Sequence, residues 1–164
     1  MLPQFPQVPV EEVWKDNMPR VIGTFKASDD WTVYASWSVG VLPGANNGGF
    51  TNQTPFVQDQ IRQIVPDIQA VLDSDKLDSY EIGSKQTLLD GRLRYSVALY
   101  QMKWSNAKAQ TALVVPATSP TNPLPFIIGG VATQGDATIR GLELEGTALL
   151  TDSWDIGGAI AFNK

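Results

Sequence analysis

Apolar side chains recur at every second position over long stretches of this 164-residue chain, and residues 31–41 form the clearest run. There Trp, Val and Ala alternate with Thr, Tyr and Ser, which is typical of a β-strand with one apolar face. Similar runs occupy residues 20–28, 79–89, 137–150 and 154–163, and another begins at residue 92. We therefore expect an all-β fold with about six strands.

The connections between these runs are alternately short and long. They span residues 29–30, 42–76, 90–91, 116–125 and 151–153. In an antiparallel up-and-down sheet, alternate connections lie at the same end, so all short turns gather on one rim. Outer-membrane β-barrels have this asymmetry, with short periplasmic turns and long extracellular loops. The pattern predicts a segment of a transmembrane barrel.

The first long connection, 42–76, contains apolar residues at helical spacing. They predict an amphipathic helix over about 56–73, with Thr54 as N-cap, Pro55 at the first helical position and Pro66 kinking or splitting it. Two roles are open for this helix: an extracellular lid over a captured ligand, or a decoration that packs its apolar stripe onto neighbouring loops. Residues 1–17 are expected to be an irregular lead-in.

Three further features concern the strands. Asp90-Gly91 is the strongest two-residue hairpin signal in the chain. Beyond Leu99 the apolar phase shifts by one residue, which indicates either a bulge or a strand that leaves its apolar surroundings. After the loop over 116–125, a segment of about 126–134 is expected to precede the strand over 137–150.

The two faces of the predicted sheet differ in charge. Trp31 and Trp154 each begin a strand just after a short turn, on the apolar face, and are predicted to form a lipid-facing aromatic girdle. A soluble sandwich would instead bury the apolar face in a core. The charged residues assigned to the opposite, lumen-facing side are Arg20, Lys26, Glu81, Lys85, Arg92, Arg94, Arg140, Glu143 and Glu145.

The composition removes most conventional site chemistry. The chain has no Cys and no His, so thiolate and imidazole metal sites, cysteine nucleophiles and histidine triads are excluded. A net charge of −5 without a basic stripe argues against nucleic acid as a partner. Glu143 and Glu145 have the same-face spacing of an acid/base pair, but nothing places a cleft there. No catalytic residue, cofactor or metal ligand is predicted.

Several motifs resemble β-strands of TonB-dependent outer-membrane receptors, and they occur in the order found in that family. They are VYASWSVG at 33–40, LDSYEIGSK at 77–85, LLDGRL at 88–93, ALY at 98–100 and GDATIRGLELE at 135–145. The sequence shows no signal peptide, plug or TonB box. The resemblance therefore implies that residues 1–164 are a fragment of a barrel that has about 22 strands around a plugged lumen.

The resemblance also implies a function and partners. The family imports siderophore-bound iron, cobalamin or oligosaccharides across the outer membrane of Gram-negative bacteria, with energy supplied by the TonB complex through the plug. The expected partners are outer-membrane lipid, the missing plug and strands, the TonB complex and the transported ligand. No enzymatic activity is expected. A second hypothesis is a soluble β-sandwich that acts as a binding or surface-interaction module.

Overall fold

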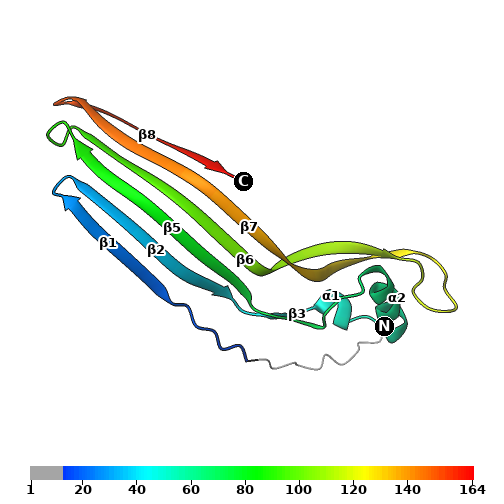
Figure 1. Cartoon of the computed structure of the whole chain (residues 1–164). Helices are drawn as coiled ribbons and strands as arrows, with labels where there is room; N and C mark the ends of the chain where they lie inside the picture. Colours follow the sequence, from blue (N-terminus) through cyan, green and yellow to red (C-terminus); the bar gives the residue numbers. More distant parts are fainter. Residues whose placement is uncertain (1–12) are drawn as a thin grey trace. The chain divides into compact units, whose positions relative to one another are not determined.

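The computed structural model describes residues 13–164, which divide into two compact units. The sheet unit comprises residues 17–42, 75–107 and 135–164, and the loop unit comprises residues 13–16, 43–74 and 108–134. The strands are β1 (Arg20–Ser28), β2 (Trp31–Leu42), β3 (Ala45–Asn46), β4 (Val71–Leu72), β5 (Asp75–Leu88), β6 (Leu93–Val115), β7 (Phe126–Thr151) and β8 (Trp154–Asn163) (Figure 1). The helices are α1 (Gly48–Thr51) and α2 (Pro55–Ile64).

Six strands form one sheet in the order β1-β2-β5-β6-β7-β8, so each strand lies beside the one that precedes it in this series. This is the up-and-down arrangement that the sequence predicted. The three short turns gather at one end of the sheet (Figure 1). Within the described residues β1 and β8 have a neighbour on one side only, so the sheet is open.

The turn between β5 and β6 has the geometry that its sequence predicts. Asp90 and Gly91 have φ angles of 53° and 88°, and the Arg92 amide donates to the Leu89 carbonyl over 3.1 Å. Positive φ at both central residues is the requirement of a type I′ turn, which Asp-Gly meets at low cost. The predicted tight hairpin is confirmed, but its turn comprises residues 89–92 instead of only 90–91, and Leu89 also has a positive φ, 54°.

Strands β6 and β7 are longer than the sequence suggested. β7 is one continuous strand over Phe126–Thr151, so the division into a segment over 126–134 and a strand over 137–150 is wrong. Of the two explanations for the phase shift beyond Leu99, the bulge is excluded, because β5 and β6 stay in register as far as Lys76 and Ser105. Asn106 is the first residue of β6 with a positive φ, 57°, and its amide donates to the Asp136 carboxylate.

The helix in the first long connection is shorter than predicted. Thr54 caps α2 as expected, because its hydroxyl accepts from the Val57 amide over 3.4 Å. The helix ends at Ile64 instead of continuing to residue 73. Pro66 explains this end, since proline disfavours helical backbone in the residue before it and has no amide hydrogen. The chain then turns into β4, which pairs with β3.

The loop unit has a hydrophobic core of its own, built from α1, α2 and the outer parts of β6 and β7. The core comprises Phe50, Val57, Ile61, Val115, Ile128 and Val131. Val57 and Ile61 on α2 are buried there, so the helix packs its apolar side chains against α1, β6 and β7. This packing is the geometry expected for the decoration role, one of the two roles considered from the sequence. Every buried hydrophobic residue in the described part of the chain belongs to this unit.

Two buried side-chain amides hold segments of the loop unit together by bonding to backbone groups. The Asn47 side chain donates to the carbonyls of Gln69 and Ala132, over 2.9 and 2.8 Å, and accepts from the Ala132 amide over 3.0 Å. Gln60 makes the same two-way pairing with Ala117. Since buried polar groups cost free energy unless they are paired, these amides specify one packing of the connections.

The sheet unit has no comparable core. Large apolar side chains on its strands are exposed, among them Phe25 at 68%, Leu99 at 55% and Ile160 at 51%. In the described residues of this unit, no second sheet and no helix covers these side chains. The hypothesis of a soluble sandwich, which required a second layer, is therefore wrong. Separately, no helix among residues 13–164 is long and apolar enough to span a membrane.

We predict that Asn47→Asp loosens the loop unit. The new carboxylate keeps the acceptor for the Ala132 amide but loses both donated hydrogen bonds, which leaves two carbonyls without their donor at a cost of about 1–3 kcal/mol each. Hydrogen exchange at the Ala132 amide should accelerate. Asn46→Asp is the matched control: this exposed neighbour uses only its acceptor oxygen, and exchange should not change. Equal exchange in both variants would contradict the role given to Asn47.

Candidate functional site

The register of the sheet determines which side chains share a face, because successive residues of a strand point to opposite sides. Direct partners such as Ala35, Ile82 and Leu99 lie on one face, which we name the apolar face. Its other large members are Val21, Phe25, Val33, Val97, Leu142, Leu144, Ile156, Ile160 and Phe162. The opposite side, named the polar face, carries Arg20, Lys26, Tyr34, Glu81, Lys85, Arg94, Tyr100, Glu143 and Glu145.

On the polar face, tyrosine rings of one strand pack over glycines of the neighbouring strand. Gly83 is the register partner of Tyr34, and a Cβ built on Gly83 would lie 2.5 Å from the Tyr34 ring. Tyr100 covers Gly141 of β7 in the same way. The Tyr34 hydroxyl also donates to Glu81 over 2.6 Å. Sequence analysis missed these pairs because only the cross-strand register shows which glycine faces which tyrosine.

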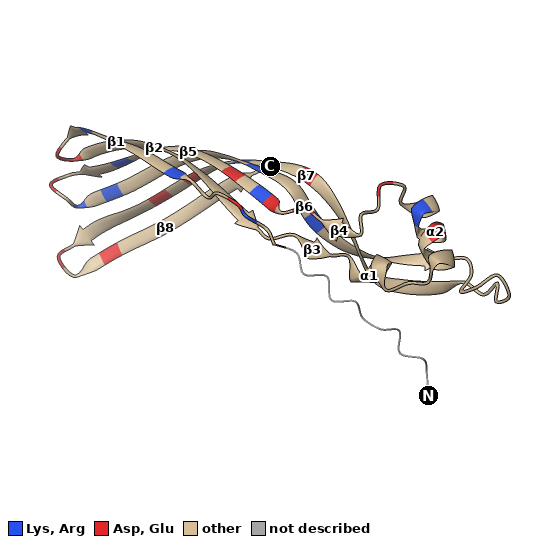
Figure 2. Cartoon of the chain, turned by 90° about the horizontal axis from the view of Figure 1, so that it is seen from below, with Lys and Arg blue, Asp and Glu red and all other residues tan. Residues whose placement is uncertain are grey.

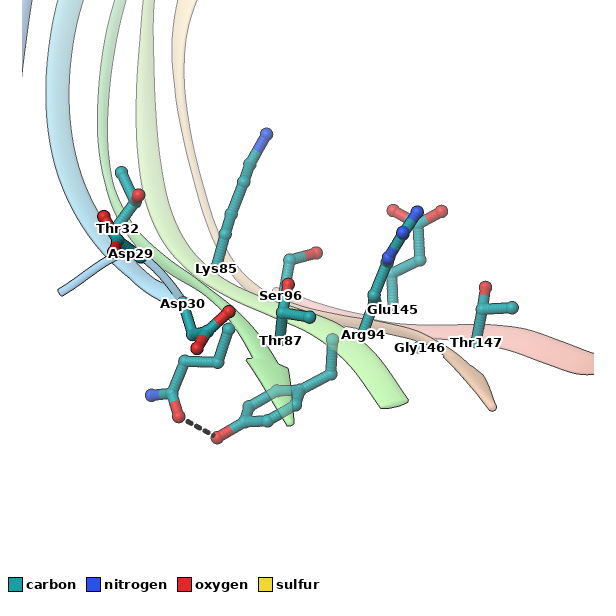
Figure 3. Close-up of a pocket in the computed structure, with 12 residues that line it drawn as sticks. Asp29, Asp30, Thr32, Lys85, Thr87, Arg94, Ser96, Glu145, Gly146 and Thr147 are labelled. Carbon is teal, nitrogen blue, oxygen red and sulfur yellow. Dashed lines mark hydrogen bonds between the residues drawn. The ribbon is translucent and has the colours of Figure 1, made fainter. Parts of the chain in front are cut away.

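Charged side chains of the polar face gather over β5, β6 and β7. Lys85, Arg94 and Glu145 project from the same side of the curved sheet (Figure 3) and line a depression of about 360 Å³. Glu81 and Glu143 line a second one, of about 440 Å³, with Lys85 and Glu145. Lys85 Nζ lies 5.7 Å from the centroid of the Tyr34 ring. In the described residues none of these charges forms an ion pair within 4.0 Å, so they are open to groups from outside this chain.

Seven of the nine predicted lumen-facing residues share the polar face, and two do not. Arg140 lies two residues before Leu142 in a regular stretch of β7, which places it on the apolar face, and its Nε donates to Gln101 over 2.8 Å. Its assignment to the polar face is wrong, because a strand repeats every two residues. Arg92 belongs to the turn. Its guanidinium donates to the Leu149 and Leu150 carbonyls, and its Nη1 lies 3.9 Å from Asp152 Oδ1.

The apolar face is bounded by two rows with polar and aromatic groups. At the turn end lie Trp31 and Trp154, the two predicted girdle residues, which are 45% and 72% exposed. At the other end, Trp37 Nε1 donates to Asp78 over 3.2 Å, beside Tyr80. Trp31 and Trp37 are separated by about 20 Å along the strand, at roughly 3.3 Å per residue. Because strands of outer-membrane barrels are tilted by about 35–45°, this separation corresponds to roughly 15 Å of height, which fits within their apolar band of roughly 25 Å.

The described residues contain no cluster of acidic or other ligating side chains that could hold a metal ion. Charges are few along the strands as a whole (Figure 2). The strands form a hydrogen-bonded wall with one uncovered apolar side and one side lined by charges, hydroxyls and tyrosines. Such a sheet is characteristic of the wall of a transmembrane β-barrel, in which lipid-facing and lumen-facing residues alternate.

Comparison with known proteins identifies the family of this chain. The chain belongs to the TonB dependent receptor-like β-barrel family, whose model matches residues 8–164. It is 22% identical over 139 residues to the probable TonB-dependent siderophore receptor PiuA of Acinetobacter baumannii, and 27% identical over 140 residues to the ferripyoverdine receptor of Pseudomonas aeruginosa. Each alignment covers 85% of this chain, and 16% and 14% of the respective relative.

Solved structures show the same fold. The pyoverdine outer membrane receptor FpvA from Pseudomonas aeruginosa PAO1, bound to pyoverdine, superposes with a TM-score of 0.55 at 25% identity, over 90% of this chain and 19% of the receptor. The FpvAI–pyocin S2 complex gives a TM-score of 0.57 at 22% identity, over 89% of this chain and 17% of the other. The expected family, barrel fold and outer-membrane location are confirmed. The relatives are receptors that transport solutes, not enzymes.

We predict that Gly83→Ala destabilises the sheet by about 1–3 kcal/mol, because the new methyl group would displace the Tyr34 ring. Urea unfolding of the detergent-folded protein, followed by tryptophan fluorescence, measures the effect. Gly23→Ala on β1 is the matched control, since a Cβ there meets no atom within 4 Å. If the two variants unfolded at the same urea concentration, the tyrosine–glycine contact would have no energetic role.

Proposed function

We propose that this chain forms part of the barrel wall of an outer-membrane receptor that imports iron bound to a siderophore. The observation that carries the proposal is the division of the six-strand sheet into an uncovered apolar face and a charged polar face, in a chain that matches a family of TonB-dependent receptors. Among the solute classes expected from the sequence, both named relatives, a probable siderophore receptor and the ferripyoverdine receptor, favour the siderophore class.

In this proposal the apolar face contacts the hydrocarbon of the outer membrane and the polar face lines the lumen. The edges of β1 and β8 present unpaired backbone groups, which lipid cannot satisfy, so further strands of the receptor pair with them. The plug of the receptor then lies against the charges of the polar face, with Lys85 and Arg94 facing acidic groups and Glu143 and Glu145 facing basic ones. The TonB complex acts on that plug.

The connections beyond the strands take the extracellular side, because the short turns of such barrels are periplasmic. The loop unit has a compact core and two buried amides that fix its packing. A rigid surface of this kind binds a ligand with less loss of conformational entropy than a flexible loop. We propose that it contributes part of the outer surface over which the ferric siderophore enters.

Uptake by a Gram-negative host without its own siderophore receptors tests this function. Cells that express the receptor carrying this chain should accumulate radiolabelled iron supplied as ferric pyoverdine or as another ferric siderophore from a panel. The same cells without TonB should not. Labelled cobalamin and a labelled maltooligosaccharide are the controls for the other two solute classes, and TonB-dependent uptake of either one without iron uptake would contradict the siderophore assignment.

A further inference from the structure

Basic residues interrupt the apolar face only near the end that leads into the long connections. Lys103 lies on this face because it follows Leu99 by four residues and Gln101 by two in a regular part of β6. Arg140 and Lys164 are direct partners there: each donates its backbone amide to the carbonyl of the other over 2.9 Å. We name Lys103, Arg140 and Lys164 the outer cation row.

Carboxylates do not neutralise the outer cation row. All three side chains are exposed, and in the described part of the chain none forms an ion pair within 4.0 Å. Asp78, the register partner of Lys103, carries a carboxylate on the same face, which accepts a hydrogen bond from Trp37 Nε1. One carboxylate beside three cations leaves the row with a net positive charge. Arg140 uses Nε to bind Gln101, which orients its guanidinium and leaves the terminal nitrogens available.

The depth of the outer cation row matches a headgroup region. Lys164, the direct partner of Arg140, comes ten residues after Trp154 at the turn end. Ten residues span about 33 Å along a strand, which is roughly 25 Å of height for strands tilted by about 35–45°. A cation on the lipid side of a barrel is far less destabilising near an interface than at the bilayer midplane.

We propose that Lys103, Arg140 and Lys164 bind the phosphate of an anionic lipid headgroup in the leaflet on the side of the long connections. Arg140 provides a planar fork that suits two phosphate oxygens, and the two lysines add point charges on either side along the sheet. The proposal rests on the lipid-facing orientation given under the proposed function. It assigns to this wall a specific lipid site in addition to general contact with hydrocarbon.

Native mass spectrometry of the receptor in an uncharged detergent tests the site. Dioleoyl phosphatidylglycerol and dioleoyl phosphatidylcholine, which have the same acyl chains, are titrated separately, and inorganic phosphate is added as competitor. The wild-type receptor should retain phosphatidylglycerol in preference to phosphatidylcholine. At about 1 kcal/mol for each basic residue near a headgroup, the triple variant K103Q/R140Q/K164Q should bind phosphatidylglycerol about a hundredfold more weakly.

The matched control, R20Q/K26Q/R94Q, removes the same three charges from the polar face and should keep wild-type lipid retention. Free phosphate in millimolar excess should not displace the lipid; displacement would show a phosphate site instead of a lipid site and would overturn the proposal. The wild-type comparison of the two lipids decides the case even if the triple variant does not fold. Equal retention of both lipids, or retention of neither, overturns the headgroup site, whereas the barrel-wall function is tested separately by the uptake experiment.

Discussion

Every backbone amide and carbonyl of a strand that crosses hydrocarbon has to be paired within the protein, because no water is present to replace a missing partner. Between neighbouring strands the six-strand sheet meets this requirement by antiparallel registers, such as the continuous one from Trp31–Gln86 to Leu42–Asp75 between β2 and β5. Among the described residues, the outer edges of β1 and β8 are left for other strands to pair. Once the backbone is paired, side chains alone decide what each face contacts. The apolar face then has the composition of a surface shaped by lipid, and the polar face that of a surface shaped by water and protein.

The loop unit satisfies a different physical requirement. Its connections leave the regular strands, so their backbone groups need partners that no ladder provides. Asn47 and Gln60 supply such partners by bonding to the backbone of residues distant in the sequence. Its apolar side chains form a small core around Ile61 and Val131. One chain therefore uses its hydrophobic residues in two ways: buried among themselves in the loop unit, and exposed on one side of the sheet.

The strand positions could be predicted because a period of two is a local signal, and the starts of β1, β2 and β8 were placed correctly from it. The predictions were wrong where a local signal was misinterpreted, and they were incomplete where a contact has no local signal. Arg140 was assigned to the wrong face although its spacing from Leu142 determines its side. The end of α2 depended on Pro66, whose effect was recognised but underestimated. The tyrosine–glycine contacts and the bonds of Asn47 join residues far apart in sequence, so only the assembled fold reveals them.

The most direct test of the central claim measures what each face of one strand contacts. The chain has no cysteine of its own, so spin labels can be introduced singly at Ser96, Val97, Ala98 and Leu99 of β6 in the receptor reconstituted into lipid bilayers. Labels at Val97 and Leu99 should be relaxed by oxygen, which concentrates in hydrocarbon, and labels at Ser96 and Ala98 by a water-soluble nickel chelate. Relaxation by the chelate at all four positions, or an absence of alternation, would contradict the lipid-facing assignment of the apolar face.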